Sequence, residues 1–208
     1  MLFFSAFLVA LSGAIMPGPV MTYTIEQSLV KGRYAGLIII IGHAVLEIAL
    51  IILILLGFGI ILKTQLAQII IGLVGGVLLA YMGLSMIHAA VKNKPAATTG
   101  PKRQLANSMI VSGFLLSALN PYFIFWWAVV GLSFIIQSYD TLGYVGVLIY
   151  FLGHICADFI LYGSISFVVG SAKKFIQGIA YRIIIAGLGC VMLFFGARFF
   201  VLAIISII

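Results

Sequence analysis

Two pairs of ionisable residues stand inside long apolar stretches of the 208-residue chain and share one spacing. His43 precedes Glu47, and His154 precedes Asp158, by four residues. Because four residues make about one helical turn, the imidazole and the carboxyl group of each pair share a helix face. An acid inside a membrane costs on the order of 3 kcal/mol and normally marks a substrate or proton path. The pairs therefore predict a site for a cation, an ammonium group or a proton; the alternative is a structural hydrogen bond within each pair.

Helix breakers form a second group of candidate residues, Pro17-Gly18-Pro19 and Asn120-Pro121. A proline removes a backbone donor, and irregular backbone inside a membrane is tolerated only where protein or water covers it. The helix N-terminus that follows such a break directs a partial positive charge toward a carboxylate. Asn120 adds an amide that both donates and accepts. The five residues are predicted to bind a substrate carboxylate, with a plain kink as the alternative at each proline.

The composition indicates which elements position these residues. Hydrophobic residues make up 64% of the chain and charged residues 7%, where roughly a quarter is usual for charged residues in soluble domains. The net charge of +7 is scattered over short loops and forms no patch. A water-soluble enzyme, a disordered regulator and a nucleic-acid binder are therefore excluded, and the lipid bilayer is the predicted environment.

The charged residues separate six apolar stretches, each long enough to supply the ~20 residues of a membrane-spanning helix. All faces of these stretches are apolar, which favours helices over the alternating strands of a barrel. The predicted fold class is an all-α integral membrane protein with six transmembrane helices. The stretches run from Met1 to about Thr24, from Arg33 to Lys63, from Lys63 to Lys92, from Arg103 to Asp140, from Asp140 to Lys173, and from Arg182 onward.

The loops between these stretches differ in charge. Loops one, three and five contain nine of the 11 Lys and Arg residues, whereas loop two contains only Lys63 and loop four contains none. The positive-inside rule then places the odd loops in the cytoplasm and both termini outside a cell membrane.

An internal repeat relates the two halves of the chain. Gly42-His43 and Glu47 recur as Gly153-His154 and Asp158, 111 positions later. Ser12-Gly13 is echoed by Ser112-Gly113, and the pair Gly76 and Gly83 by Gly189 and Gly196. Three spans in each half make the repeat inverted, which is typical of secondary transporters. We expect a single domain over 1–208, with repeat one at 1–91, a cytoplasmic linker at 92–107 and repeat two at 108–208.

Two further patterns concern packing. Phe125-Trp126-Trp127 is predicted to anchor the protein at a membrane interface in preference to lining a cavity. Small residues in the third span indicate close helix contact. Their spacing leaves open whether the contact lies within one chain or between two, and a homodimer is compatible with it. These residues are Gly72, Gly75, Gly76 and Gly83.

Over essentially its full length the chain resembles the LysE-type translocators, of the LysE and RhtB amino-acid exporter group. The resemblance rests on the stretch from Ser12 to Pro19, on Asn120-Pro121, and on the aromatic residues that follow. It implies an inner-membrane exporter of amino acids or related metabolites that is energised by the proton gradient. Such a protein is not an enzyme and needs no cofactor, and its partners are a small-molecule substrate and the bilayer, with no nucleic acid.

The wider superfamily supplies two alternatives. Two imidazoles and two carboxylates suit a divalent cation if the pairs converge, so a metal exporter is the second hypothesis. An electron carrier would need reactive cysteines beside the prolines, whereas Cys156 and Cys190 lie elsewhere. The expected mechanism is alternating access with proton antiport, in which Glu47 or Asp158 attracts an ammonium group or carries the proton. His43 and His154 would tune these acids.

Overall fold

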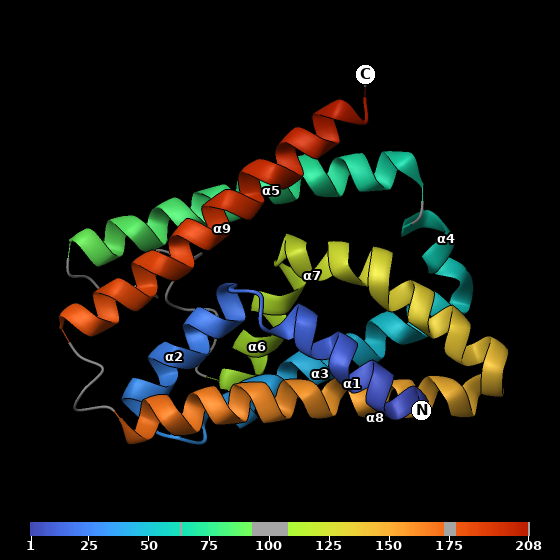
Figure 1. Ribbon diagram of the computed structural model, residues 1–208, viewed down its shortest axis with the longest axis horizontal. Helices are drawn as coiled ribbons and strands as arrows, with labels where there is room; N and C mark the ends of the chain where they lie inside the picture. Colours follow the sequence, from blue (N-terminus) through green and yellow to red (C-terminus); the bar gives the residue numbers. More distant parts are fainter. Residues whose placement is uncertain (63, 93–107, 173–177, 208) are drawn as a thin grey trace.

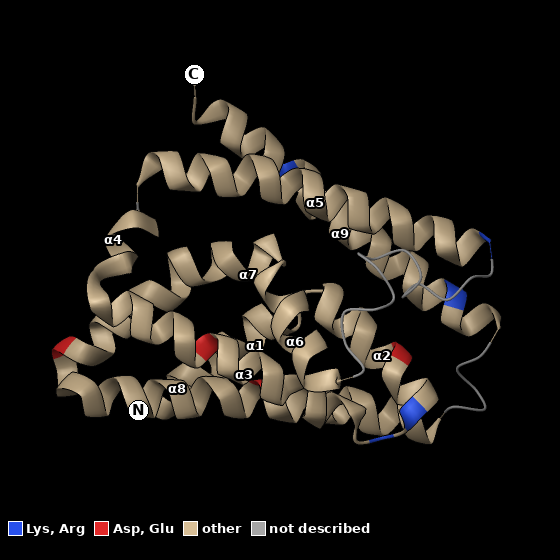
Figure 2. Ribbon diagram, turned by 180° about the vertical axis from the view of Figure 1, so that it is seen from behind, with Lys and Arg blue, Asp and Glu red and all other residues tan. Residues whose placement is uncertain are grey.

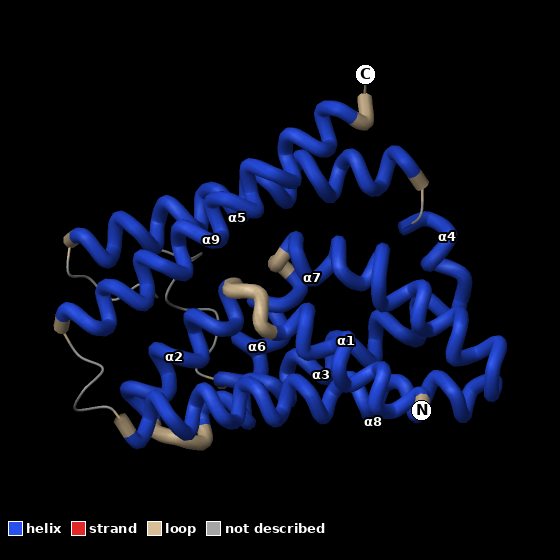
Figure 3. The backbone as a smooth tube through the Cα atoms, in the orientation of Figure 1, coloured by secondary structure: helices blue, strands red, loops and turns tan. Residues whose placement is uncertain are grey.

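The computed structural model describes residues 1–62, 64–92, 108–172 and 178–207, most of which form helices (Figures 1 and 3). Within these ranges no residue forms a β-strand, so the predicted all-α class is confirmed. The helices are α1 (Leu2–Ala14), α2 (Pro19–Lys31), α3 (Ala35–Leu53), the π-helical turn η1 (Ile54–Phe58), α4 (Gly59–Leu62), α5 (Gln65–Val91), α6 (Met109–Ala118), α7 (Pro121–Trp126), the π-helical turn η3 (Trp127–Gly131), α8 (Leu132–Ser171) and α9 (Ile179–Ile205).

Several of these helices are long and apolar enough to cross a membrane. Four described segments meet this criterion, and a fifth is added if α1 and α2, bent by 81° to each other, form one span. The prediction of a multi-pass membrane protein is thus confirmed. Helix α6 has ten residues and is about 15 Å long, half the thickness of the hydrocarbon core. The count of six spans therefore stays a prediction.

The longest apolar segment, Pro121–Ser171, has 51 residues and reverses its direction. A straight helix of that length would measure about 75 Å, more than twice the hydrocarbon thickness. Helical geometry fails at Leu142 and at Gly143, whose φ of 58° is one that glycine adopts without strain. A side chain on Gly146 would meet the carbonyl of Ser138, so the two arms are in contact directly beside the bend. The bend is visible at the right of Figure 1, and it lies close to the span boundary predicted at Asp140.

Helices α5 and α9 lie side by side and cross the top of the molecule as one layer (Figure 1). A Cβ placed on Gly83 would lie 2.5 Å from the Gly189 carbonyl oxygen, and one on Gly189 would lie 2.8 Å from that of Gly83. Gly76 and Gly196 face each other in the same way, at 2.7 Å in both directions. The two backbones therefore touch, and these glycines pack within the chain.

This contact gives a stability prediction. Gly189→Val is expected to lower the melting temperature in detergent, at a cost of about 1 to 3 kcal/mol, because the added side chain forces α9 away from α5. Gly187→Val is the matched control on the same helix, since no atom lies within 4 Å of the Cβ position there. Equal melting temperatures for the two variants would contradict the glycine contact.

The helices at the centre of the molecule also approach one another through glycine. Gly42 on α3 lies against the backbone of Ile110 on α6, and Gly153 on α8 lies against the backbone of Phe3 on α1. Because Gly42 precedes His43 and Gly153 precedes His154, each close helix contact lies one residue from an imidazole. These contacts fix the depth and the rotation at which both histidines enter the core.

Most of the described Lys and Arg residues gather at one end of the molecule (Figure 2). Helix α2 ends there at Lys31, and Arg182 donates from Nε to the carbonyl oxygen of Ala90 at 2.6 Å, near the end of α5. This end contains the described parts of the loops that are predicted to be cytoplasmic. The side of the membrane that it occupies stays a prediction, and apart from Lys92 the predicted linker lies outside the described residues.

Candidate functional site

The first break separates α1 from α2 at the predicted position. Helix α1 ends at Ala14, and Gly18 precedes α2 in an extended conformation with φ −154° and ψ −177°. Pro19 is the first residue of α2, where its missing N–H removes no intrahelical hydrogen bond. Pro17 lies in the connection, shown in tan in Figure 3. The sequence thus makes a true discontinuity here, with two short helices in place of one kinked helix.

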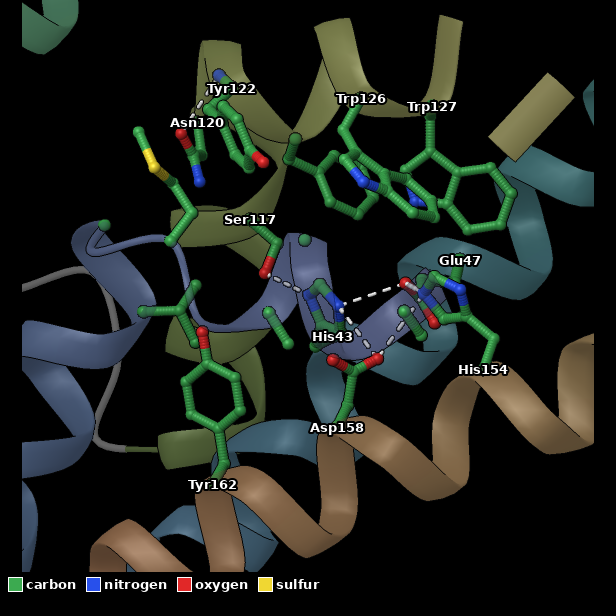
Figure 4. A pocket seen from close by; sticks show the side chains of 17 residues that line it. His43, Glu47, Ser117, Asn120, Tyr122, Trp126, Trp127, His154, Asp158 and Tyr162 are labelled. Atoms are coloured by element: carbon green, nitrogen blue, oxygen red, sulfur yellow. Dashed lines mark hydrogen bonds and ion pairs between the residues drawn. The ribbon is translucent and has the colours of Figure 1, made fainter. Parts of the chain in front are cut away.

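The second break separates α6 from α7. Asn120 is the N-cap of α7, and its Oδ1 accepts a hydrogen bond of 3.1 Å from the backbone N–H of Tyr122. Pro121 takes the first helical position, as Pro19 does in α2. A Cβ placed on Gly18 would lie 3.3 Å from Asn120 Nδ2, so the two breaks meet in space although a hundred residues separate them in the sequence. The amide nitrogen of Asn120 points into the pocket between them (Figure 4).

The two His and acid pairs form one cluster beside these breaks (Figure 4). His154 Nε2 lies 2.9 Å from Glu47 Oε1, and His43 Nε2 lies 3.1 Å from the same oxygen. Asp158 Oδ2 is farther from both imidazoles, at 3.5 Å from His154 Nε2 and 3.8 Å from His43 Nε2. Glu47 and Asp158 are both buried. The shortest distance between an imidazole and an acid joins His154, in the second half of the chain, to Glu47, in the first half. The two pairs therefore form one interacting group.

Ser117 orients the ring of His43. His43 Nδ1 lies 2.7 Å from Ser117 Oγ, and the Ser117 hydroxyl donates to the carbonyl oxygen of Gly113 at 2.7 Å. Because a hydroxyl has one hydrogen, this donation leaves its oxygen to accept from an Nδ1–H group. The Nε2 atom of His43 then faces Glu47. A hydrogen bond forms between them when either Nε2 or the Glu47 carboxyl group carries a proton.

Aromatic rings cover the cluster on one side (Figure 4). The Trp126 and Trp127 ring centroids lie 5.1 and 5.2 Å from that of His154, and the Phe123 centroid lies 5.3 Å from that of His43. Both tryptophans are buried, so the predicted interfacial anchor is wrong for them. The third residue of that run, Phe125, packs against Phe199 on α9. The rings exclude water from one side of the acids, which strengthens the electrostatic interactions there.

One cavity of about 50 Å³ collects most of the residues predicted from the sequence. Its lining includes residues of both breaks and of both His and acid pairs, namely Gly18, Asn120, His43, Glu47, His154 and Asp158. Pro17, Pro19 and Pro121 do not line it; Pro121 packs against Gly75 of α5. The prolines define the shape of the breaks, and a direct contact between them and a substrate stays a prediction.

Sequence reasoning missed several cavity residues. Ser117, Tyr122 and Tyr162 provide polar groups. Gly13 leaves room for the indole ring of Trp126, since a Cβ on Gly13 would lie 2.8 Å from the indole nitrogen. One signal was available for Tyr162, which follows Asp158 by four residues and so continues the helix face of the acid.

The donor set of the cluster also fits a metal ion. His43, Glu47 and Asp158 each offer one ligand atom, and these atoms lie within 4.8 Å of one another. Imidazole nitrogen and carboxylate oxygen together suit divalent transition ions. An ion there would have to replace the contact between His43 and Glu47, because Glu47 Oε1 already faces two imidazole nitrogens.

Comparison with known proteins identifies the family. The model of the family described as LysE type translocator matches residues 11–202, which is nearly the whole chain. No curated protein and no solved structure matches it. The match includes both helix breaks, all four residues of the acid and imidazole cluster, and the aromatic rings above it. The chain therefore belongs to the LysE-type translocators, a family of membrane exporters and not of enzymes.

Proposed function

We propose that the protein exports amino acids or related small zwitterions across the cytoplasmic membrane by alternating access, with proton antiport. The observation that carries this proposal is the distribution of charge around one cavity. Acids and imidazoles lie on one side of it, and helix N-termini with the amide nitrogen of Asn120 lie on another (Figure 4). In an amino acid an ammonium group and a carboxylate group are bonded to the same carbon atom. A single molecule can therefore place a positive group at the acids and a negative group at the helix N-termini.

The substrate carboxylate binds at the helix breaks. Both α2 and the α7 segment begin beside the cavity, at Gly18 and Asn120, so their positive ends face it. The Oδ1 atom of Asn120 is occupied by its own helix, which leaves Nδ2 to donate to a ligand. The missing side chain at Gly18 leaves space beside that nitrogen.

The substrate ammonium and the proton share the acid cluster. Glu47 Oε1 faces two imidazole nitrogens at 2.9 and 3.1 Å, whereas Asp158 Oδ2 is 3.5 and 3.8 Å from them and forms no hydrogen bond within the described residues. Glu47 Oε2 also has no hydrogen-bond partner there, so the shorter imidazole contacts of Oε1 are what distinguish the two acids. Asp158 therefore receives the ammonium group, and Glu47 with the imidazoles holds the proton. Each of the two ligands adds positive charge to the same buried cluster and so weakens binding of the other. That competition is the basis of antiport.

Six spans in two inverted repeats would provide the symmetry that alternating access uses. The contacts of Gly83 with Gly189 and of Gly76 with Gly196 support this arrangement, because exchanging the halves turns one pair into the other. The bend at Gly143 supports it too, since each arm of Pro121–Ser171 is long enough to cross the membrane. The echo of Ser12-Gly13 by Ser112-Gly113 gives no support: Gly13 faces Trp126, and Gly113 faces the backbone of Ile39.

Asn120 distinguishes carboxylate binding from a plain kink. Asn120→Ala is expected to raise the apparent KM about tenfold, because it removes the donor Nδ2. Asn120→Asp is the matched control, since its carboxylate still caps α7 yet repels a carboxylate ligand. If Asn120 acts only as a helix cap, Asn120→Asp is expected to keep the apparent KM of the parent. If Nδ2 binds the substrate, Asn120→Asp is expected to raise the apparent KM at least as much as Asn120→Ala. Initial rates in proteoliposomes over a range of substrate concentrations separate the two.

Divalent cation export is the second candidate, favoured by the three ligand atoms of His43, Glu47 and Asp158. The same cavity would then bind a metal ion at the acids, and the helix N-termini at the breaks would have no partner of opposite charge. That unused half of the cavity makes it the less favoured candidate.

Transport in proteoliposomes tests both candidates. Under an imposed pH gradient, a panel of amino acids is screened beside Mn²⁺ and Cd²⁺ while a trapped dye follows protons. Amino-acid flux that moves protons in the opposite direction is expected. Metal flux without amino-acid flux would overturn the proposal in favour of the second candidate, and amino-acid flux without proton movement would remove the antiport step.

A further inference from the structure

Helix α8 continues the polar face of the cluster beyond the cavity. His154, Asp158, Tyr162 and Ser166 follow one another at intervals of four residues, and all four are buried. Four-residue spacing aligns them along one ridge of the helix. The ridge runs toward the end of α8 where Gly170 lies against the backbone of Arg33. A buried polar group costs free energy unless it is hydrogen-bonded or hydrated, so apolar side chains would be expected here if the ridge only packed.

Helix α2 covers this ridge with polar side chains of its own. Thr24 and Ser28 are both fully buried, and Thr24 Oγ1 has no hydrogen-bond partner in the described part of the chain. Ser28 Oγ lies 2.9 Å from Ser166 Oγ, which also accepts from the backbone N–H of Gly36 at 2.9 Å. The seam between α2 and α8 is thus closed by a short chain of hydrogen bonds next to loop one.

In the opposite direction this face of α8 carries one further polar group, the buried hydroxyl of Tyr150, whereas the equivalent face of α3 is apolar on the corresponding side. The residues that correspond to Tyr162 and Ser166, 111 positions earlier, are Ile51 and Leu55. Ile51 belongs to an apolar core cluster together with Trp127 and Leu132. The polar ridge therefore has no counterpart in the first half of the chain, so symmetry between the halves does not explain it.

Helix α2 is also suited to move. It begins at the break at Gly18, and close backbone contact through glycine is confined to its far end, where Gly170 of α8 lies against Gly32 and Arg33, in contrast to the contacts along α5 and α9. Besides the apolar packing of Val20, Met21 and Ile25 in the core, α2 makes further polar contacts. Thr22 Oγ1 lies 3.7 Å from Met86 Sδ, and the Tyr181 hydroxyl donates to Glu26 at 3.0 Å. Hydrogen bonds of this kind exchange for bonds to water at small net cost when a helix swings away.

The geometry points to a substrate path along the seam of α2 and α8, lined by Thr24, Ser28, Tyr162 and Ser166. It leads from the loop-one side of the membrane to the acid cluster and is closed here by the contact between Ser28 and Ser166. Movement of α2 about the break at Gly18 opens it. The path rests on the proposed function, because it delivers the zwitterion to the same cavity.

Cysteine accessibility tests the path without any substrate. In a background that lacks the two native cysteines, Thr24→Cys is compared with Ile51→Cys, a buried position on the other side of the cluster. Sealed vesicles are treated from the loop-one side with a membrane-impermeant maleimide. Thr24→Cys is expected to be labelled while Ile51→Cys is not. Absence of labelling at Thr24→Cys, or equal labelling of both, would overturn the path.

A disulfide tests whether opening of the seam is needed for transport. The two hydroxyl oxygens of Ser28 and Ser166 are 2.9 Å apart, which places their Cβ atoms near the separation that a disulfide requires. Oxidation of the Ser28→Cys/Ser166→Cys variant is expected to abolish its transport and reduction to restore it. Oxidation of either single variant leaves its own reduced rate unchanged. Full transport by the cross-linked protein would overturn the path.

The two measurements separate failure of the path from failure of the proposed function. If no amino acid is transported even by the parent protein, the proposed function fails, whereas labelling of Thr24→Cys still reports on the seam. If amino acids are transported but the seam neither opens to the maleimide nor blocks flux when cross-linked, only the path fails.

Discussion

Glu47→Gln is expected to lower gradient-driven transport by about 100-fold or more, the range for removing one member of a buried charged pair. Glu47 Oε1 faces the Nε2 atoms of both His154 and His43, and glutamine neither keeps that charge nor takes up a proton. Substrate exchange without a pH gradient is expected to continue, because Asp158 remains. The measurement is flux into proteoliposomes with and without the gradient, after gel filtration has shown that the variant is folded.

Asp140→Asn provides the control for Glu47→Gln. Asp140 is also an acid of the second half of the chain, but it is exposed beside the bend of α8 and lies outside the cavity of the cluster. The transport rate of Asp140→Asn is expected to equal that of the parent protein. If Glu47→Gln also matches the parent, the cluster is a structural hydrogen-bond network and the proton is carried elsewhere.

Asp158→Asn is expected to abolish both gradient-driven transport and substrate exchange. Its Oδ2 atom has no hydrogen-bond partner within the described ranges, so the substitution leaves the contacts between Glu47 and the imidazoles in place. The loss therefore reflects binding of the ammonium group, and it is expected to exceed about 30-fold. Counterflow of labelled substrate measures exchange, and substrate-induced thermal stabilisation measures binding.

Asp158→Glu serves as the matched variant, because it keeps the charge and changes only its position. It is expected to retain part of the exchange that Asp158→Asn loses. Parental counterflow by Asp158→Asn would show that the ammonium group binds elsewhere and would reverse the roles assigned to the two acids.

The parts of the site that could be predicted from sequence are those that depend on neighbouring residues. The four-residue spacing of His43 and Glu47 and the chemistry of Pro19 and Pro121 act within one helical turn. Convergence of the two pairs could not be predicted in this way. It depends on how α3 and α8 are rotated, which the contacts of Gly42 and Gly153 with other helices determine.

Other features have no distinctive local pattern. Trp126 and Trp127 have the composition of an interfacial anchor, and only the start of α7 at a break inside the protein directs them to the cavity. Ser117 donates to the carbonyl four residues earlier, as serines in apolar helices commonly do, so nothing in the sequence distinguishes it. The short length of α6 also has no local signal, because it depends on how the surrounding helices pack.

The lengths of α5 and α9 have a consequence for the lipid around the protein. Each has 27 residues and measures about 40 Å, against about 30 Å for an average hydrocarbon core. A pair joined backbone to backbone relieves such a hydrophobic mismatch by tilting as one body or by thickening the bilayer around it. Acyl-chain length is therefore a variable that sets the orientation of this pair, and reconstitutions in thin and thick membranes should differ in rate.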